Sequence, residues 1–362
     1  MIFVYIFFGI IFIEFILRYY FVSSPDEENN NIKRIPNLSL KRDYFVKSDY
    51  ADNTNATQDS KLGWKLKKNS ELVVNVRMPY IKESLNYNYK TNDKGARTEK
   101  YSGKKKTLGF FGCSITYGHG LNERETFAYQ VCKKKEDFDY LNFGVAGYSL
   151  YQSLLQLKEV SKEVNLDKAI FTVHKDLERR NTCSFSWLKI INRAWAVPGI
   201  ILLMGLKIKI KPRKYIKLPN LKIKIINIIE FLINFLLYSC GDLKTVKKKT
   251  NEHLLKEIKK ECEDNKIELI ILCLDNINDL SKFLNKNKFN WNFSGISLSE
   301  ENHKGENKWL LMPWDNHPNL EANKIFAEKI LEVIQSNERP HSPKITAVTE
   351  KKNPQEFIYP LY

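Results

Sequence analysis

The sequence is poor in the residue patterns that mark fibrous, cross-linked or metal-bound proteins. Only 15 glycines and 12 prolines occur among 362 residues, and aromatic residues reach 12%, which excludes a collagen-like repeat and wholesale disorder. The six cysteines form no CxxC pair and the six histidines no HxxxH pair, so neither a disulfide framework nor a zinc site is expected. No P-loop and no GxGxxG motif occurs, and we expect no cofactor.

Acidic residues are also scarce relative to basic ones, and the formal net charge is +16. Such an excess of positive charge can indicate binding to nucleic acid, to an anionic membrane surface or to an acidic polymer. A mean hydropathy of −0.41 argues against a multi-spanning transporter. Half of the excess lies within residues 207–224, which hold no Asp or Glu. We expect its eight basic residues to contact a membrane surface or an anionic glycan, and no fold signature of specific nucleic-acid binding accompanies them. They are Lys207, Lys209, Lys211, Arg213, Lys214, Lys217, Lys222 and Lys224.

The N-terminus carries the longest apolar run of the chain. Residues 2–13 are uninterrupted apolar, and the character continues past Glu14 and Arg18 to Val22, about the 20 residues that a bilayer-spanning helix needs. Glu14 and Arg18 are spaced to pair on one helix face. Because no basic region precedes the run and no small-x-small site follows it, a retained transmembrane anchor at 1–22 fits better than a cleaved signal peptide. A buried core helix is the alternative.

The flanks of this span give a weak indication of its orientation. Arg18, Lys33 and Arg34 follow the apolar run, and the positive-inside rule read literally would keep the rest of the chain in the cytoplasm. The acidic residues at 26–28 and the low charge count weaken that reading. Residues 23–60 are polar and Asn-rich and are predicted to form a linker.

Strand-like and helix-like segments alternate from about residue 105 onwards. This alternation predicts an α/β domain with a parallel sheet covered on both faces, in which ligand chemistry belongs at the carboxyl ends of the strands. The predicted strands are 107–112, 139–145, 168–173 and 267–274, and the predicted helices are 150–164, 243–265 and 319–335. The domain is assigned to 61–340 and a C-terminal tail to 341–362.

An insert at residues 182–242 interrupts this alternation and is predicted to be irregular. Its second apolar stretch, residues 225–238, places Asn227, Glu230 and Asn234 at spacings of three and four, a narrow polar stripe on an apolar helix. The pattern suits a helix lying in a membrane interface as well as a helix buried against the sheet. A second transmembrane span is less favoured, because it would enclose charged residues.

The strongest chemical signal is FGCSITYGHGL, in which Ser114 follows a strand and is surrounded by glycines. A hydroxyl at a strand-to-helix turn is exposed, but serine needs a general base that a third group holds in place. Near the C-terminus, PWDNHPNLEAN offers Asp315 and His317 just before the last helix. A single turn can present both of these side chains to one site.

Together these segments resemble the SGNH/GDSL hydrolase superfamily. The first block reads Gly112-Cys113-Ser114, and the last block is matched by Asp315 and His317. The second block, LNFGVAGYS, offers Asn142 and places Gly147 at the oxyanion-hole glycine. The resemblance implies a flavodoxin-like three-layer sandwich. LGW at 62–64 and NDKGAR at 92–97 are similar to the lead-in of membrane-anchored members.

Two departures from the family pattern stand out. The Asp beside the nucleophile is Cys113 here, so Cys113 as nucleophile is an alternative, although a cysteine beside a strand end is more often packed. The third block, normally G-x-N-D, reads Val-His-Lys-Asp at 173–176, and Lys175 occupies the place of the oxyanion-hole Asn. Lys175, His174 or Asn181 could supply the missing donor, and the sequence leaves these three open.

The resemblance implies acyl-ester chemistry, with Ser114 as nucleophile, His317 as base and Asp315 as its orienting carboxylate. The backbone N–H groups of Ser114 and Gly147 would hold the oxyanion. Water would complete an esterase cycle, and a sugar hydroxyl would complete an O-acyltransferase cycle. Membrane-anchored members suggest an acylated cell-surface polysaccharide or glycolipid as substrate, and with it an extracytoplasmic catalytic domain on a single-pass protein. A catalytically inactive glycan-binding or scaffold protein of the same fold is the alternative.

Overall fold

The computed structural model of the chain describes eleven stretches of sequence. They are residues 9, 12–14, 55–76, 83–98, 101–191, 196–203, 205–218, 224–275, 278–296, 307–311 and 316–338. Within the expected anchor at 1–22, Gly9 and residues 12–14 are helical, and the rest of that segment lies outside the described residues. Most of the expected linker, Asp315 and the expected tail at 341–362 also lie outside them.

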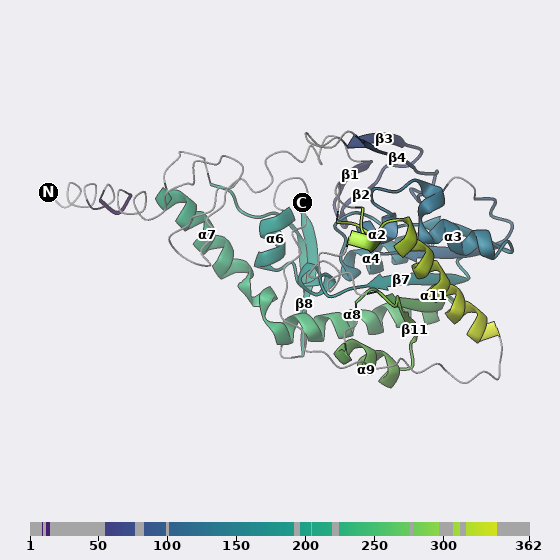
Figure 1. Cartoon of the computed structure of the whole chain (residues 1–362). Coiled ribbons are helices and arrows are strands. Elements are labelled where there is room, and N and C mark those ends of the chain that lie inside the picture. Colours follow the sequence, from purple (N-terminus) through teal and green to yellow (C-terminus); the bar gives the residue numbers. More distant parts are fainter. Residues whose placement is uncertain are drawn as a thin grey trace.

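In the part of the chain that is described, the largest sheet has five parallel strands in the order β11-β10-β7-β5-β6 (Figure 1). This sheet confirms the predicted α/β class, and four of its strands coincide with the predicted ones. The edge strand β11 was not predicted, because its sequence Asn-Trp-Asn-Phe is half polar. The strands are β5 (Lys106–Phe111), β6 (Phe138–Asn142), β7 (Lys168–Val173), β10 (Glu268–Cys273) and β11 (Asn290–Phe293).

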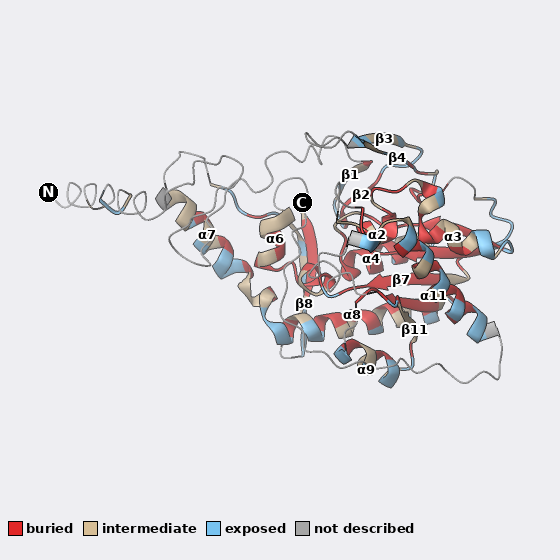
Figure 2. Ribbon diagram, viewed as in Figure 1, coloured by how far each residue is buried: buried red, intermediate tan, exposed pale blue. Residues whose placement is uncertain are grey.

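Helices cover both faces of this sheet, so the strands are apolar on both sides and alternate residues enter two separate cores. Leu108 and Phe110 of β5 pack towards α3 and α11, whereas Phe111 packs towards α4, α8 and α9. The buried residues form a continuous band through the sheet and the inner helix faces (Figure 2). The helices are α3 (Phe127–Lys134), α4 (Leu150–Val160), α8 (Lys244–Asp264), α9 (Asn278–Lys286) and α11 (Leu320–Glu338).

Two antiparallel hairpins precede the sheet and pack against the loops that follow β5 and β6. The predicted linker ends too late, because residues from Asn55 onwards are already folded and Asp59 accepts the N–H groups of Lys61 and Leu62 in the first hairpin turn. The hairpins are β1 (Ala56–Asp59) with β2 (Gly63–Leu66) and β3 (Glu71–Val76) with β4 (Leu85–Lys90).

The described residues of the insert at 182–242 form helices and a hairpin rather than an irregular segment, which corrects the prediction. The alternation of Lys and Ile in residues 207–211 is a strand pattern of period two, and it forms an antiparallel hairpin that turns at Gly205 with φ of 80°. The insert consists of α6 (Phe185–Ile191), β8 (Val197–Leu203), β9 (Leu206–Arg213), α7 (Lys224–Tyr238) and a 3₁₀ turn at Ser239–Asp242.

Helix α7 confirms the helix that residues 225–238 predict, but it does not pack on the sheet. It projects from the domain on the side away from α3 and α11 (Figure 1) and contacts α6 and the 3₁₀ turn that follows it. Its polar stripe faces the protein, where Glu230 and Asn234 are buried. The expectation of a helix buried against the sheet is therefore wrong, because the polar side chains find their partners in the insert itself.

Among the described residues, no single helix combines the length and hydropathy of a membrane span. Helix residues Ile226–Asp242 and Lys244–Asp264 pass that test as a pair, with a bend of 57° between them.

Candidate active site

The turn after β5 holds Ser114 at the carboxyl end of the sheet. Gly112 leaves the strand with φ of 156°, and a Cβ there would lie 2.2 Å from Thr116 Oγ1 and 2.5 Å from Thr172 Oγ1, so only glycine fits. Cys113 then adopts an extended conformation, and Ser114 begins the short helix α2 (Ser114–Tyr117). The tight turn thus presents the Ser114 hydroxyl where the sheet ends.

The loop before α11 holds His317 opposite this turn. The backbone C=O of His317 accepts the N–H of Leu311 at 2.9 Å, which ties the loop to the preceding segment. Asn319 caps α11 by accepting the N–H of Ala322 at 3.1 Å, and Asn323 accepts the N–H of Phe127 on α3 at 3.0 Å. The HPN…AN sequence therefore fixes the position of the His317 loop against two helices.

The structure brings Ser114 and His317 together across 203 positions of sequence. The Ser114 Oγ lies 2.8 Å from His317 Nε2, a hydrogen-bond distance, and Ser114 is buried. Asp315, the third residue that the sequence singles out, lies outside the described residues. The observed geometry is a serine hydroxyl paired with an imidazole, which is the pairing that nucleophilic catalysis by serine requires.

Arg97 clamps the segment that follows the serine helix. It is fully buried, and its Nη1 donates to the C=O groups of Tyr117 at 2.6 Å and Gly118 at 2.8 Å. Its guanidinium carbon lies 4.7 Å from the ring centre of Tyr89 and 5.3 Å from that of Tyr117. The NDKGAR segment that ends at Arg97 therefore supports the nucleophile turn, a role that its sequence pattern alone did not disclose.

Trp64 supports the neighbouring loop, which carries Gly147. Its indole Nε1 donates to the C=O of Ala146 at 3.1 Å, and a Cβ on Gly147 would lie 3.2 Å from its ring. The same loop is tied to the serine turn, because the Val145 N–H donates to the Gly112 C=O at 3.1 Å. Gly147 has φ of 79°. The loop expected to hold the oxyanion thus lies next to the serine turn.

A second histidine lies beside His317, and sequence reasoning missed it. The rings of His119 and His317 have centroids 4.6 Å apart. The Tyr89 hydroxyl accepts the Gly120 N–H at 3.0 Å and lies 3.2 Å from His119 Nδ1, so its own hydrogen is available to His119. Burial raises the pKa of Tyr89 well above its ordinary value, which keeps this hydroxyl protonated. His119 stands within the quoted FGCSITYGHGL segment, but nothing in its spacing distinguishes it.

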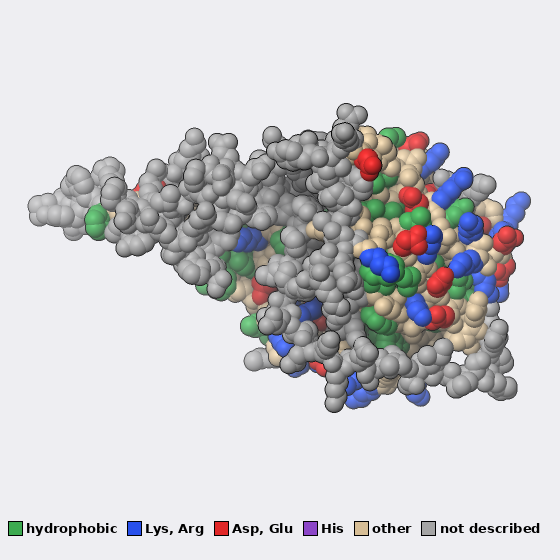
Figure 3. Space-filling view, viewed as in Figure 1, with side chains coloured by type: hydrophobic (Ala, Val, Ile, Leu, Met, Phe, Trp, Pro, Cys, Tyr) green, Lys and Arg blue, Asp and Glu red, His purple; other side chains and the backbone are tan. Residues whose placement is uncertain are grey.

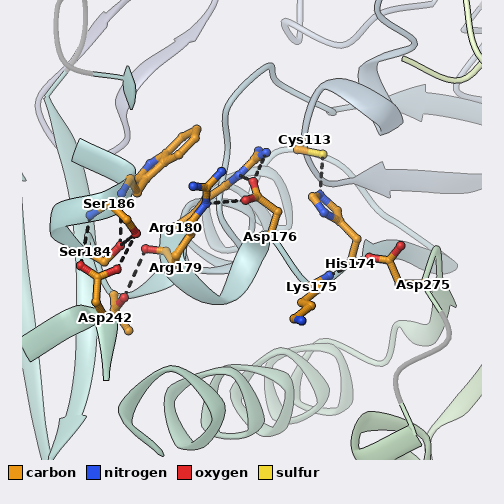
Figure 4. A network of polar contacts seen from close by, with 12 residues as sticks. Cys113, His174, Lys175, Asp176, Arg179, Arg180, Ser184, Ser186, Asp242 and Asp275 are labelled. Atoms are coloured by element: carbon orange, nitrogen blue, oxygen red, sulfur yellow. Dashed lines mark hydrogen bonds and ion pairs between the residues drawn. The ribbon is translucent and has the colours of Figure 1, made fainter. Parts of the chain in front are cut away.

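Cys113 and His174 form a separate buried pair beneath the serine turn. The Sγ of Cys113 lies 3.3 Å from His174 Nε2, and both side chains are buried (Figure 4). Burial alone would raise the pKa of the Cys113 thiol, but His174 and the nearby Arg180 guanidinium lower it to about 6. The thiol belongs to the core on the α4 and α8 side of the sheet, so Cys113 and Ser114 have different histidine partners.

The other two residues considered for the missing donor lie elsewhere. Lys175 is exposed, and its side chain points away from Cys113 (Figure 4), while its backbone N–H donates to Asp275 at 2.9 Å. Asn181 is fully buried, and its amide donates to Asn251 on α8 at 3.0 Å. Of the three, only His174 contacts the serine turn, through Cys113.

Asp176 anchors the third block by ion pairing. Its carboxylate binds Arg179 and Arg180, with Arg180 Nε at 2.6 Å, and both Asp176 and Arg180 are buried. Burial alone would raise the pKa of Asp176, but Arg180 and Arg179 together lower it to about 2. The segment after β7 is therefore held by charge, in contrast to the apolar strand that leads into it.

No protein-family model and no curated protein matches this sequence. Solved structures match in fold, each at probability 1.00. A lipolytic protein of the G-D-S-L family from Veillonella parvula is 12% identical, with a TM-score of 0.36, over 63% of this chain and 98% of that one. A putative lipolytic protein of the G-D-S-L family from Desulfitobacterium hafniense is 12% identical, with a TM-score of 0.37, over 63% and 99%. The esterase EstA from Pseudoalteromonas is 9% identical, with a TM-score of 0.37, over 65% and 99%.

Two of the described basic residues of the insert have partners within the fold. Lys207 pairs with Glu257 on α8, and the Arg213 guanidinium carbon lies 4.2 Å from the ring centre of Tyr238. The side chains of Lys222 and Lys224 are outside the described residues. Exposed members of the set are Lys207, Lys209, Lys211, Lys214 and Lys217. No group of three His, Cys, Asp or Glu side chains is arranged to hold a metal ion in the described part of the chain.

Proposed function

We propose that this protein is a serine esterase of the SGNH/GDSL type that works through an acyl-enzyme. The observation that carries the proposal is the 2.8 Å contact between Ser114 Oγ and His317 Nε2. Two further features support it: the contact lies at the carboxyl end of a parallel sheet, and it joins the first and last sequence blocks of the family resemblance.

In the first half-reaction, His317 Nε2 accepts the proton of Ser114 as Oγ attacks the ester carbonyl carbon. The tetrahedral intermediate collapses when the alcohol leaves with the proton that His317 holds, and the acyl group stays on Oγ. In the second half-reaction, His317 deprotonates a water that attacks the acyl carbon. The bond between that carbon and Oγ then breaks, His317 returns the proton to Oγ, and the carboxylic acid is released. A sugar hydroxyl in place of that water makes the same cycle an O-acyl transfer.

His317 can accept the proton only while it is neutral and carries its own hydrogen on Nδ1. Asp315, two positions before His317, is the residue that the family resemblance assigns to hold that tautomer. The oxyanion is assigned to the N–H groups of Ser114 and Gly147, and the 3.1 Å bond between Val145 and Gly112 supports this pairing of loops.

The substrate that we propose is an ester-linked acyl group on a cell-surface polysaccharide or glycolipid. This assignment comes from the sequence resemblance to membrane-anchored members, through the LGW and NDKGAR segments and the apolar run at 2–13. An N-terminal membrane anchor with an extracytoplasmic catalytic domain completes the proposal.

A fluorophosphonate probe tests the nucleophile directly. We expect the full chain to be labelled at Ser114 and labelling to disappear in Ser114→Ala. Ser336→Ala on α11 is the matched control, and Cys113→Ala keeps the Ser114–His317 pair while removing the neighbouring thiol. Both variants should still be labelled.

Absence of labelling in the folded protein would contradict the proposal and favour the alternative, an inactive glycan-binding or scaffold protein. Labelling that persists in Ser114→Ala and is lost in Cys113→Ala would assign the nucleophile to the thiol instead. Hydrolysis of a chromogenic acetate ester by the same four proteins gives a second readout that does not depend on the probe.

A further inference from the structure

Helix α7 reverses part of the pattern of an ordinary surface helix, because it buries two polar side chains and exposes several large apolar ones, while Phe231 and Tyr238 pack on its protein side. Glu230 and Asn234 lie on its protein-facing side and are buried, whereas large apolar side chains lie on the outer side. In a water-soluble domain the apolar stripe of such a helix normally faces the core. The reversal therefore calls for a partner on the outside.

The inward polar side chains form hydrogen bonds with residues 214–218, the segment between β9 and α7. We call this segment the strap. The Asn234 side-chain amide makes two hydrogen bonds with the backbone of Ile216, as a neighbouring β-strand would. It donates to the C=O and accepts the N–H, both at 2.8 Å. Glu230 accepts the N–H of Leu218 at 2.8 Å. Because these bonds satisfy an extended backbone that has no sheet partner, the orientation of α7 is specified by hydrogen bonding.

The outward side of α7 forms an apolar ridge. Leu236 is 78% exposed, Leu232 is 47% exposed and Phe235 is 44% exposed. Ile229, Leu232 and Leu236 recur every three or four positions, so they lie along one side of the helix, and no charged residue stands among them. These three residues are the ridge; Phe235 is partly exposed too, but its ring centroid lies 5.7 Å from that of Phe185 on α6.

Exposed basic side chains lie on the strap beside α7. The strap that lies against α7 carries Lys214 and Lys217, both exposed, and residues 206–218 contain no Asp or Glu. On the face drawn in Figure 3, hydrophobic and basic side chains lie close together in the α7 region. Exposed apolar side chains on α7 together with exposed lysines on the adjoining strap match the interface of an anionic bilayer, where acyl chains lie beneath phosphate groups.

A second copy of the chain is the weaker occupant. In a two-fold dimer each ridge would meet the same ridge, and the lysines of one strap would approach those of the other. Like charges at such a contact disfavour association, whereas lipid phosphates neutralise them.

We propose that the α7 ridge and the strap lysines form a lipid-docking surface that lays the insert on an anionic membrane. The surface does not depend on the serine chemistry proposed above. It would hold the catalytic domain at the membrane by a second contact, separate from the N-terminal apolar run.

Photo-labelling from the acyl chain region tests this surface in the full chain. The protein is bound to phosphatidylcholine vesicles with or without about 30% phosphatidylglycerol, each carrying a diazirine acyl chain. Trypsin cleavage after Lys224 and Lys244 isolates α7 as the peptide 225–244. We expect this peptide to be labelled, and labelling to fall about fivefold or more when phosphatidylglycerol is omitted.

Leu232→Glu/Leu236→Glu should remove labelling of the 225–244 peptide, and Lys214→Glu/Lys217→Glu should reduce it about tenfold. Val73→Glu, on another exposed apolar side chain, and Lys104→Glu/Lys133→Glu are the matched controls and should change nothing. Labelling of the N-terminal segment serves as the internal reference for vesicle binding. Ester hydrolysis in solution should be the same in all of these variants, which separates this test from that of the catalytic proposal.

Labelled N-terminal peptides with an unlabelled 225–244 peptide in both vesicle types would overturn the proposal. Equal labelling with and without phosphatidylglycerol would overturn the role of the lysines. A concentration-dependent dimer that Leu232→Glu/Leu236→Glu abolishes, with no lipid labelling, would assign the ridge to a second copy. Should the double Glu variant fail to fold, the comparison of the two vesicle types on the unaltered chain still decides.

Discussion

The sheet domain and the insert use opposite rules for placing polar and apolar side chains. In β5, Leu108, Phe110 and Phe111 are fully buried, and the helices beside them expose their charged sides. In α7 the buried positions are Glu230, Asn234 and Tyr238, and leucines face outwards. The sheet domain is therefore held together by apolar burial, whereas the orientation of α7 is set by hydrogen bonds to one extended segment.

This difference indicates which region can contact a lipid phase without losing the protein's internal packing. Removing the apolar ridge of α7 exposes no interior, whereas removing an apolar residue from the sheet leaves a cavity. Four measurements test this comparison, from the largest expected effect to the smallest.

The sheet domain should carry all of the chemistry. His317→Ala should lower kcat/KM for an acetate ester by at least about 10⁴-fold, because Ser114 loses its base. His253→Ala, on α8 at the edge of the insert, should leave kcat/KM within a factor of about two. Equal losses in the two variants would contradict this assignment.

Apolar burial should dominate the stability of the sheet. Phe110→Ala should lower the free energy of unfolding by about 3–5 kcal/mol, because the Phe110 ring on β5 is fully buried and packs against Phe127 of α3. Urea unfolding monitored by circular dichroism measures the change. Val73→Ala, on a side chain that is 74% exposed, is the control and should change it by less than about 0.5 kcal/mol.

Charge should hold the segment after β7, and its effect should depend on pH. The folded pKa of Asp176 is about 2, below the ordinary value of about 3.9, so its contribution is complete above that ordinary value and is lost as the pH falls through the folded pKa. We expect Asp176→Asn to lower stability at pH 7 by roughly 2–3 kcal/mol and to flatten the acid limb below about pH 4. Asp137→Asn, on an exposed side chain just before β6, should keep the acid limb of the unaltered protein.

The reversed faces of α7 predict the smallest and most diagnostic pair of effects. Asn234→Ala should destabilise the protein by about 1–3 kcal/mol, because Ile216 loses partners for both its N–H and its C=O. Leu236→Ser should change stability by less than about 0.5 kcal/mol in the absence of lipid. A larger loss for Leu236→Ser than for Asn234→Ala in thermal unfolding would reverse the comparison.

The parallel sheet was predictable because strands buried on both faces are continuous apolar runs, as in residues 168–173 and 267–274. The hairpins at 56–90 were not predicted, because their strands are short and, apart from Glu71–Val76, no more than half of the residues in each are hydrophobic. The roles of Arg97 and Tyr89 could not be predicted from this mixed composition either. Their importance comes from backbone carbonyls and rings contributed by other segments, which no local pattern encodes.

The candidate site divides in a similar way. Ser114 and His317 were singled out from residue types and from the family resemblance, and the structure places them 2.8 Å apart. The choice among His174, Lys175 and Asn181 could not be made from sequence, since it depends on which way each side chain points after β7. The contact between His119 and His317 also depends on two loops meeting in space.

By itself, the sequence determined the α/β class, the order of the main strands and helices, the serine and histidine blocks, and the existence of helix 225–238. Periodicity could place a polar stripe on that helix, because side chains repeat every 3.6 residues. Periodicity could not determine which stripe faces inwards. That depends on whether the protein surface beside the helix offers hydrogen-bond partners or apolar partners. Only the tertiary structure decided this, by setting the strap against Asn234 and Glu230 and leaving the leucines outside.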